Sequence, residues 1–248
     1  MSPATLAAAG TVPGKLMIAG EYAVLAPDGC CLAVAVGQLA KWSLAEPAGE
    51  AILTLRAFDK IWQWPLAALL QGPLPQGLGS FAAGAVRAAA ERWPATLPLQ
   101  SMDLQVAGSV GGAKLGLGTS AAVTVAVLSA WAAAQHQLTE PADLAALGRQ
   151  VHHTLQNGQG SGYDVTTQAM GGVVAYRRSP DRAEPLNWPT GLHGLALYTG
   201  EPAATQKHLD GQQPGPVALA AIAQAAQTLL ADWSTASTRP VHWMRQPS

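Results

Sequence analysis

Residue types that suit phosphate chemistry gather in one stretch of the chain, residues 111–122. It reads Gly-Gly-Ala-Lys-Leu-Gly-Leu-Gly-Thr-Ser-Ala-Ala, so clustered glycines are followed by two hydroxyls and an alanine-rich run. Glycine allows positive φ and leaves backbone N–H groups open to a ligand. The first turn of a helix has unpaired N–H donors at the positive end of its dipole. The stretch therefore predicts an anion site, most often for phosphate, and the alternative is a tight turn that only leads into a helix.

A lysine near the N-terminus stands in apolar surroundings. Lys15 follows Pro13-Gly14 and precedes an apolar run that ends in Gly20-Glu21. A charge in a low-dielectric site is costly without an opposite partner, so Lys15 is a candidate contact for an anion. The alternative is a lysine at the end of a strand whose amine reaches solvent.

A single carboxylate follows a loop rich in glycine and serine. Asp164 is the only acidic residue between Asp143 and Asp181. Such a carboxylate can accept a proton or pair with a cation such as Lys15. It can also cap a helix that begins at Val165, and these roles are compatible.

Two further stretches carry weaker signals. Residues 198–205, Tyr-Thr-Gly-Glu-Pro-Ala-Ala-Thr, offer hydroxyls at a turn but would pass for an ordinary loop. Residues 116–121 match the loose form of the dinucleotide-binding fingerprint, and Glu140 follows about 20 residues later. No repeated strand–helix–strand pattern surrounds that match, so an NAD-dependent oxidoreductase is a minor alternative.

Composition describes a globular protein and argues against several classes. Hydrophobic residues make up 49% of the 248 residues and charged residues 12%, which is ample for a core. The net charge of −1 argues against a nucleic-acid-binding protein, which would be basic. The adjacent Cys30 and Cys31 predict buried packing in a reducing, cytoplasmic setting. The N-terminus lacks the basic region of a signal peptide, and the apolar run 121–134 is shorter than the roughly 20 residues a membrane span needs.

Both strands and helices are expected to position these residues. Strands are predicted at 11–18, 31–44, 51–58, 101–107, 171–178 and 192–198. Helices are predicted at 78–93, 120–136, 139–155 and 216–233, with loops at 72–77 and 157–162. We expect the strands 31–44 and 51–58 to pair across a Pro-Ala-Gly turn. Early strands followed by helices, without an internal repeat, indicate an α+β protein.

In their order along the chain, these stretches resemble the motifs of the GHMP kinase superfamily. Residues 13–25 are similar to its first motif, and residues 116–122 to its phosphate-binding second motif, with Thr119 in place of a serine. The Gly-Glu-Tyr, Gly-Ser-Gly-Tyr-Asp and Thr-Gly-Glu-Pro-Ala-Ala-Thr forms are most similar to the phosphomevalonate kinase branch. The resemblance extends from about Val12 to Thr205.

This resemblance implies a fold and a domain division. Residues 1–190 would form an ATP-binding GHMP kinase N-terminal domain of the ribosomal-S5-like kind. Residues 191–248 would begin a truncated, ferredoxin-like C-terminal portion. The family's glycine-rich third motif is absent after Gly200, because only Gly211 and Gly215 remain. We therefore expect that part of the C-terminal domain is missing, and that exposed apolar surface would favour homo-oligomers.

The resemblance also implies an activity. It points to an ATP- and Mg²⁺-dependent kinase that transfers the γ-phosphoryl group to phosphomevalonate, in the mevalonate pathway of isoprenoid precursor synthesis. Mevalonate kinase and a diphosphomevalonate decarboxylase-like enzyme are alternatives within the family. A degenerate domain that binds nucleotide without turnover is the alternative from another class. The expected partner is a small-molecule phosphoryl acceptor, with no nucleic acid and no membrane.

Carried over position by position, the resemblance assigns roles to individual residues. Catalysis would fall to Asp164 with Lys15 beside it, and Ser120 would reach Mg²⁺. The nucleotide phosphates would contact Lys114, Gly116, Leu117, Gly118, Thr119, Ser120 and Ala121. The acceptor would contact Glu21, Tyr22, Ser161, Gly162 and Thr205. Arg177 and Arg178 would either meet a substrate phosphate or be solvated charges at a strand end.

One position departs from the pattern of mevalonate kinases. Those enzymes place a Mg²⁺-binding glutamate some residues before the catalytic aspartate, and an ungapped comparison puts His153 there. Magnesium prefers oxygen ligands, so His153 is a poor substitute. Together with the absent third motif, this keeps the non-catalytic alternative open.

Overall fold

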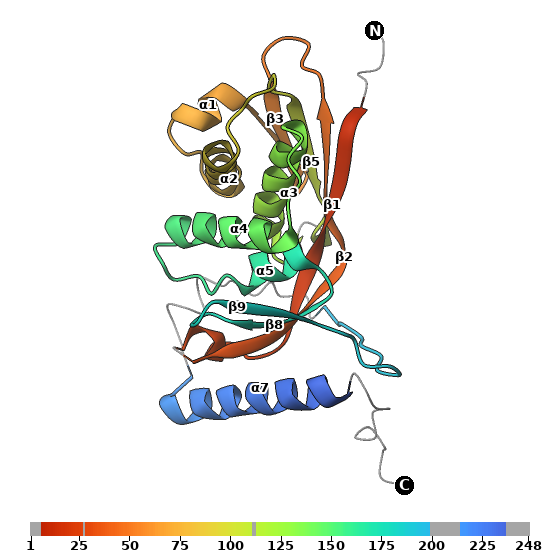
Figure 1. The fold of residues 1–248 in the computed structure, drawn as a ribbon, viewed down its shortest axis with the longest axis vertical. Helices are drawn as coiled ribbons and strands as arrows, with labels where there is room; N and C mark the ends of the chain where they lie inside the picture. Colours follow the sequence, from red (N-terminus) through yellow and green to blue (C-terminus); the bar gives the residue numbers. More distant parts are fainter. Residues whose placement is uncertain (1–5, 27, 111–112, 199–213, 237–248) are drawn as a thin grey trace.

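The computed structural model describes residues 6–26, 28–110, 113–198 and 214–236 (Figure 1). A seven-stranded sheet has the order β4 (Lys60–Pro65), β3 (Ile52–Ala57), β5 (Ser101–Val106), β2 (Cys30–Ala45), β8 (Val173–Arg177) and β9 (Arg182–Leu186). The strand β1 (Leu6–Ala19) pairs with β2 off this path. Among its described pairs, only β3 and β5 run parallel. The α+β expectation is confirmed, and the doubly wound parallel sheet of an NAD-binding fold is not what these residues form.

A long antiparallel pair, β1 (Leu6–Ala19) and β2 (Cys30–Ala45), runs the length of the sheet. The other edge of β2 is shared by two strands in succession. Its C-terminal part pairs with β5 (Ser101–Val106), and its N-terminal part pairs with β8 (Val173–Arg177). The strand β2 therefore joins the two halves of the sheet that Figure 1 shows above and below its middle.

The expected pairing of residues 31–44 with 51–58 is wrong. The strand β3 (Ile52–Ala57) lies parallel to β5, which separates it from β2. The antiparallel partner of β3 is β4 (Lys60–Pro65), a strand that we did not predict. The turn between them places Phe58 and Asp59 at φ values of 52° and 58°. Such hairpin turns favour glycine or asparagine, so the sequence carried little signal for this one.

Helices cover the upper half of the sheet. The predicted helices are confirmed as α2 (Leu78–Arg92), α3 (Thr119–Ala134), α4 (Pro141–Leu155) and α7 (Pro216–Ala236). Two short helices were not predicted as elements, α1 (Leu66–Gln71) and α5 (Tyr163–Met170). Nearly every side chain of α3 after its first turn is buried, because α2, α4 and the sheet surround it. The apolar run 121–134 is thus the centre of the core, and no helix in the described ranges combines the length and apolarity needed to cross a membrane.

The lower half of the sheet is packed on both faces. Alternate residues of β2 and β8 point to opposite sides. Cys31 and Tyr176 cluster with Tyr163 of α5, whereas Leu32 and Val173 cluster with Trp233 of α7. Both cysteines are free and buried, so the prediction of buried packing is confirmed.

The expected strand at 192–198 is wrong. These residues form no ladder with any described strand, and Leu195 and Leu197 are 85% and 80% exposed. Instead, β9 (Arg182–Leu186) occupies the free edge of β8. An alternating apolar pattern needs a neighbouring strand and a face to bury, and neither is present here among the described residues. The predicted division at residue 190 stays a prediction.

Candidate active site

The glycine-rich loop and the first turn of α3 form a set of backbone donors. Gly116 and Gly118 have φ values of 74° and 85°, and Gly118 is the N-cap of α3. The first bond of the helix runs from the N–H of Ala122 to the oxygen of Gly118, and no side chain caps the helix. In the described part of the chain, the N–H groups of residues 119–121 therefore have no protein acceptor. Gly111 and Gly112, where the predicted stretch begins, lie outside the described residues.

The carbonyls of the loop are bound on one side. The Lys15 amine donates to the oxygen of Gly116 at 3.1 Å, and the Lys15 N–H donates to that of Leu117 at 3.0 Å. The Gln168 side-chain amide donates to the oxygens of Leu117 and Gly118, at 3.1 and 3.2 Å. In a planar trans peptide the N–H points opposite to the C=O. The N–H groups of residues 117–119 therefore point away from Lys15 and Gln168, as an anion-binding loop requires.

Lys15 is half-buried beside this loop rather than extended into solvent. Its amine lies 5.3 Å from the centre of the Tyr163 ring. Burial lowers the pKa of Lys15, while the charges of Asp164 and Glu21 act to raise it. No ion pair joins Lys15 to Asp164 in the described part of the chain. The predicted pairing is thus an interaction through the local field, without direct contact.

Asp164 lies in the first turn of α5, and its charge acts on Lys15 without a direct ion pair. The N-cap of this helix is Gly162, with φ 82°, and the Val165 N–H donates to Asp164 Oδ1 at 2.9 Å. The capping alternative is wrong, because the helix begins at Tyr163, its N-cap is Gly162 and no side chain caps it; Asp164 instead accepts a bond from its neighbour within the first turn. A negative charge at this end of a helix is also favourable.

The groups around Asp164 respond to its charge. It raises the pKa of Tyr163, after the larger effect of burial, and it acts in the same direction on Lys15, His152 and Cys31. The charge of Asp164 therefore acts on titratable groups from four elements, β1, β2, α4 and α5.

The residues expected to contact the acceptor are only partly brought together. Glu21 is exposed at the end of β1, close enough to Lys15 to raise its pKa. Tyr22, at φ 60°, directly precedes the short 3₁₀ helix η1 (Ala23–Leu25). Ser161 lies on the loop before α5, where its carbonyl accepts a bond from the Tyr176 hydroxyl at 2.9 Å. Thr205 and the rest of residues 199–213 lie outside the described residues.

Two other predicted residues have structural contacts of their own. A Cβ on Gly162 would lie 2.8 Å from Arg149 Cδ, so only glycine fits there. Lys114 is exposed on the short strand β7 (Ala113–Lys114), which pairs with β6 (Ser109–Val110). Its amine lies 5.1 Å from the ring centre of Phe58. No described contact joins Lys114 to Lys15 or Asp164, so its assignment as a phosphate contact stays a prediction.

His152, which the sequence comparison passed over, is the histidine that reaches α3. It is 2% exposed, and its Nε2 lies 3.1 Å from the Thr124 hydroxyl, which donates to the oxygen of Ser120. Burial lowers the pKa of His152, and Asp164 partly offsets this. The expected position, His153, is exposed. Helical spacing was the available signal, because His152 follows the buried Gly148 by four residues.

Gln168 was also missed. It lies four residues after Asp164, hence on the same face of α5. An i, i+4 pair of polar residues on a helix that also buries Val165 could have singled it out, but we offered a helix after Asp164 only as an alternative.

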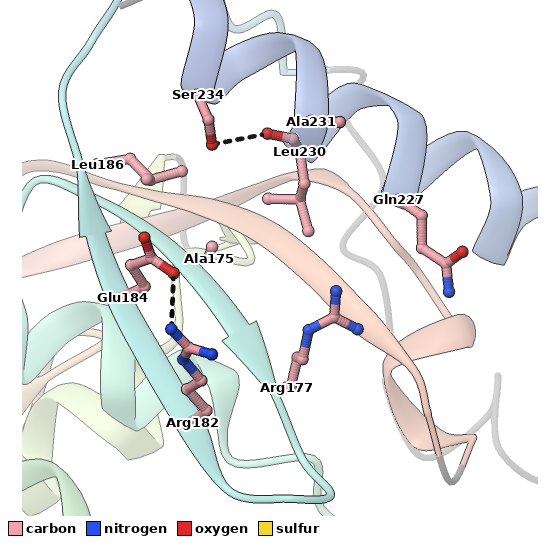
Figure 2. A pocket seen from close by; sticks show the side chains of 9 residues that line it. All are labelled: Ala175, Arg177, Arg182, Glu184, Leu186, Gln227, Leu230, Ala231 and Ser234. Atoms are coloured by element: carbon pink, nitrogen blue, oxygen red, sulfur yellow. Dashed lines mark hydrogen bonds and ion pairs between the residues drawn. The ribbon is translucent and has the colours of Figure 1, made fainter.

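Arg177 and Arg178 face different cavities. Arg178 directly follows β8, donates to the oxygen of Gly158 at 2.9 Å, and lines a cavity of about 430 Å³ that Ser161 also lines. Arg177 lines a separate cavity of about 290 Å³ between β8, β9 and α7, as Figure 2 shows. Of the two, only Arg178 therefore lies beside the loop that leads to Asp164.

Two residues of the candidate site carry oxygen atoms of the kind that magnesium prefers as ligands. Mg²⁺ in phosphate-binding sites takes one or two protein oxygens and completes its shell with phosphate oxygens and water. Ser120 and Asp164 supply a hydroxyl and a carboxylate, each in the first turn of its helix. No group of three His, Cys, Asp or Glu side chains in the described ranges could hold a metal without such help.

Comparison with known proteins adds a family and a fold. Residues 80–172 match the family model described as the GHMP kinases N terminal domain. This segment runs from α2 to the end of α5 and contains both the glycine-rich loop and Asp164. No curated protein matches the sequence.

Solved structures share the fold at low sequence identity. A Lin0012 protein from Listeria innocua has 23% identity and a TM-score of 0.76, over 92% of this chain and 72% of that one. Streptococcus pneumoniae phosphomevalonate kinase, in complex with phosphomevalonate and AMPPNP, has 19% identity and a TM-score of 0.75, over 93% and 75%. The Methanococcus jannaschii mevalonate kinase has 18% identity and a TM-score of 0.61. That match covers 76% of this chain but only 57% of the mevalonate kinase.

Proposed function

We propose, from the match of residues 80–172 to the model of the GHMP kinases N terminal domain, that the chain is an ATP-dependent small-molecule kinase. The observation that supports the proposal most is the arrangement of the loop 116–118. Its carbonyls are bound by Lys15 and Gln168, so its N–H groups and those of the α3 first turn are left for an anion. The same helix that supplies Gln168 carries Asp164.

The proposed mechanism rests on position and charge. Phosphoryl transfer needs alignment of donor and acceptor, and neutralisation of the charge on the transferring group. The free N–H groups of residues 117–121 would bind the nucleotide phosphates, and the Lys15 ammonium would offset charge on the group in transfer. Magnesium, when bound, would add positive charge, with Ser120 and Asp164 as its protein ligands. Asp164 also keeps Lys15 protonated, since its charge opposes the effect of burial on the pKa of that lysine.

We propose phosphomevalonate as the acceptor, with ATP as the donor. In support, the Streptococcus pneumoniae enzyme whose fold this chain shares was solved with phosphomevalonate and AMPPNP. A phosphate acceptor has a second pKa of about 6, so it needs little deprotonation at neutral pH. Asp164 would then act mainly by orienting the acceptor and Lys15. Arg178, beside Ser161, is the cation best placed to meet the acceptor's own phosphate.

Three other activities remain as alternatives to be tested. Mevalonate kinase differs from the proposal in the acceptor, and a diphosphomevalonate decarboxylase-like enzyme differs in the acceptor and also in releasing carbon dioxide. A degenerate domain would bind ATP without turnover. The division into residues 1–190 and 191–248 belongs to the same proposal.

The test is ATP consumption with mevalonate, phosphomevalonate or diphosphomevalonate, for the wild type and for Asp164→Asn. We expect turnover with phosphomevalonate, and a loss of at least about 100-fold in kcat for Asp164→Asn, the usual size of an acid–base or orienting contribution. An unchanged urea unfolding transition of the variant is the control for folding. Analogue binding without turnover on any of the three acceptors would replace the proposal with the degenerate domain.

A further inference from the structure

Gln168 is a buried polar side chain whose part in the proposed reaction has not been assigned. It is 2% exposed on α5, and its amide nitrogen donates to two consecutive carbonyls of the glycine-rich loop, those of Leu117 and Gly118. These bonds join residues that are fifty and fifty-one positions apart in the chain. The amide thus attaches α5 to the loop.

The chemistry of the partners fixes the orientation of this amide. Two carbonyl oxygens can be paired only by the NH₂ end, since the oxygen end cannot donate. In consequence, the Gln168 Oε1 atom is buried without a hydrogen-bond partner in the described part of the chain. A buried acceptor without a partner is unfavourable, and an apolar side chain of the same shape would avoid it. The gain from glutamine at this position is therefore the pair of bonds to the loop.

The geometry around Gly118 requires close approach of the same groups. A Cβ atom on Gly118 would lie 3.1 Å from Gln168 Nε2 and 3.1 Å from Lys15 Cγ. The absence of a side chain at Gly118 lets both residues reach the loop. It also leaves the peptides on either side of Gly118 free to rotate, so that bonds to their carbonyls are needed to keep one orientation.

Gln168 and Asp164 lie one turn apart on the same face of α5. A rigid helix that binds the loop at one turn and carries the carboxylate at the preceding turn sets the distance between the two. Rotation of the 117–118 or 118–119 peptide would turn a carbonyl towards the bound phosphates, which is repulsive, and would withdraw an N–H donor.

We propose that Gln168 is a positioning residue that fixes the nucleotide loop relative to Asp164 and thereby sets the affinity for the ATP phosphates. This inference rests on the proposed kinase function. It predicts an effect on ATP and on the loop, with no direct effect on the acceptor, because Gln168 contacts neither the acceptor-side residues Glu21 and Tyr22 nor the loop at Ser161 in any described bond.

The test compares Gln168→Met, which keeps the length but loses the donors, with the matched control Thr167→Val. Thr167 is a buried neighbour on α5 whose hydroxyl bonds only to the Tyr163 carbonyl of its own helix. The measurements are binding of a non-hydrolysable ATP analogue by calorimetry, amide hydrogen exchange of the free protein, and the KM values for ATP and acceptor.

For Gln168→Met we expect about tenfold weaker analogue binding, equivalent to roughly one lost hydrogen bond. Exchange should be faster at the Lys15 and Ala122 amides, which donate to the same two carbonyls that Gln168 binds, and unchanged in 163–170. The KM for ATP should rise while that for the acceptor stays within about twofold. Thr167→Val should change none of these. If Gln168→Met does not fold, Gln168→Asn serves instead, since its amide is one methylene too short to reach both carbonyls and should give the same split.

Analogue binding within about twofold of the wild type, with unchanged exchange at the Lys15 and Ala122 amides, would overturn the inference while leaving the kinase function intact. Failure of the wild type itself to bind the analogue would remove the kinase function. In that case hydrogen exchange tests the positioning role of Gln168 by itself. Unchanged exchange in Gln168→Met would overturn that role, and faster exchange would support it for the loop.

Discussion

At the scale of single residues, the site consists of one carboxylate and the neighbouring groups whose pKa values its charge raises. The charge of Asp164 acts on Lys15 of β1, on His152 of α4 and on Tyr163 of α5. These three groups come from three separate elements. The carboxylate thereby links the lysine beside the nucleotide loop to the histidine beneath the first turn of α3.

The pH dependence of stability should report His152. Burial lowers the pKa of His152 below its model-peptide value of 6.5 in the folded protein. Below pH 6.5 the unfolded chain therefore binds the proton more readily, so the free energy of unfolding falls as pH decreases through 6.5 towards the folded pKa. We expect His152→Gln to flatten this part of the profile, measured by urea unfolding at several values between about pH 5 and 8.

His153→Gln is the matched control for that profile, because His153 is the exposed neighbour. It should leave the slope unchanged. An equal loss of slope in both variants would mean that burial of His152 is not its cause.

At the scale of elements, close packing of α4 on α5 positions Asp164. The helices meet at Gly148, where an added Cβ would lie 2.5 Å from the Val165 side chain. Val165 directly follows the catalytic candidate and is fully buried. A displacement of α5 at this point would therefore move the carboxylate itself.

Gly148→Ala should be destabilising by about 1–3 kcal/mol, the usual result of overpacking a core, and should lower kcat because α5 must shift. The measurements are urea unfolding and the ATP-consumption assay. Gly49→Ala is the control, because a Cβ there would meet nothing within 4 Å, and it should change stability by less than about 0.5 kcal/mol. A Gly148→Ala variant as stable and active as the wild type would show that the packing of α4 on α5 accommodates the added methyl group without displacing α5.

The elements that sequence could predict best were those with long apolar runs, such as α3 and the long strand β2. Residues 192–198 show the opposite case, because their apolar alternation would need a neighbouring strand that the described fold does not provide. The hairpin of β3 and β4 was missed because Phe58 and Asp59 adopt positive φ without the usual turn residues. Strand order was beyond the sequence as well, since β5 enters between β2 and β3 only through long-range packing.

The candidate site follows the same division. The loop 116–122, Lys15 and Asp164 were found from residue type and spacing, and the structure brings them together. His152 and Gln168 were not, because their roles depend on which face of a helix is buried and on what lies opposite. Thr205 lies outside the described residues, so its assignment stays a prediction.

At the scale of the whole molecule, α7 covers the lower half of the sheet. Trp233 is 4% exposed, its indole donates to the Asn187 carbonyl at 2.9 Å, and its ring meets that of Trp188 edge-on at 5.4 Å. It packs with Leu32 and Val173 from the face of β2 and β8 opposite α5. The strands that carry the site on one face are therefore stabilised by α7 on the other.

Trp233→Ala should cost about 3–5 kcal/mol of unfolding free energy, as for other buried tryptophans, measured by urea unfolding. Val217→Ala, on the same helix but 86% exposed, should change it by less than about 0.5 kcal/mol. Similar small effects from both variants would show that α7 contributes little to the fold.

The expected homo-oligomers remain a prediction. The exposed side chains of Leu195 and Leu197 provide apolar surface that would favour such association.

The most direct test of the proposed kinase function follows the γ-phosphoryl group itself. The measurement is a single turnover of γ-labelled ATP on excess enzyme with phosphomevalonate, with label counted separately in acceptor and in inorganic phosphate. We expect label in the acceptor for the wild type, and a rate of label transfer that is lower by at least about 100-fold for Asp164→Asn. Label that appears only as inorganic phosphate, or that reaches the acceptor equally fast in Asp164→Asn, would contradict this proposal.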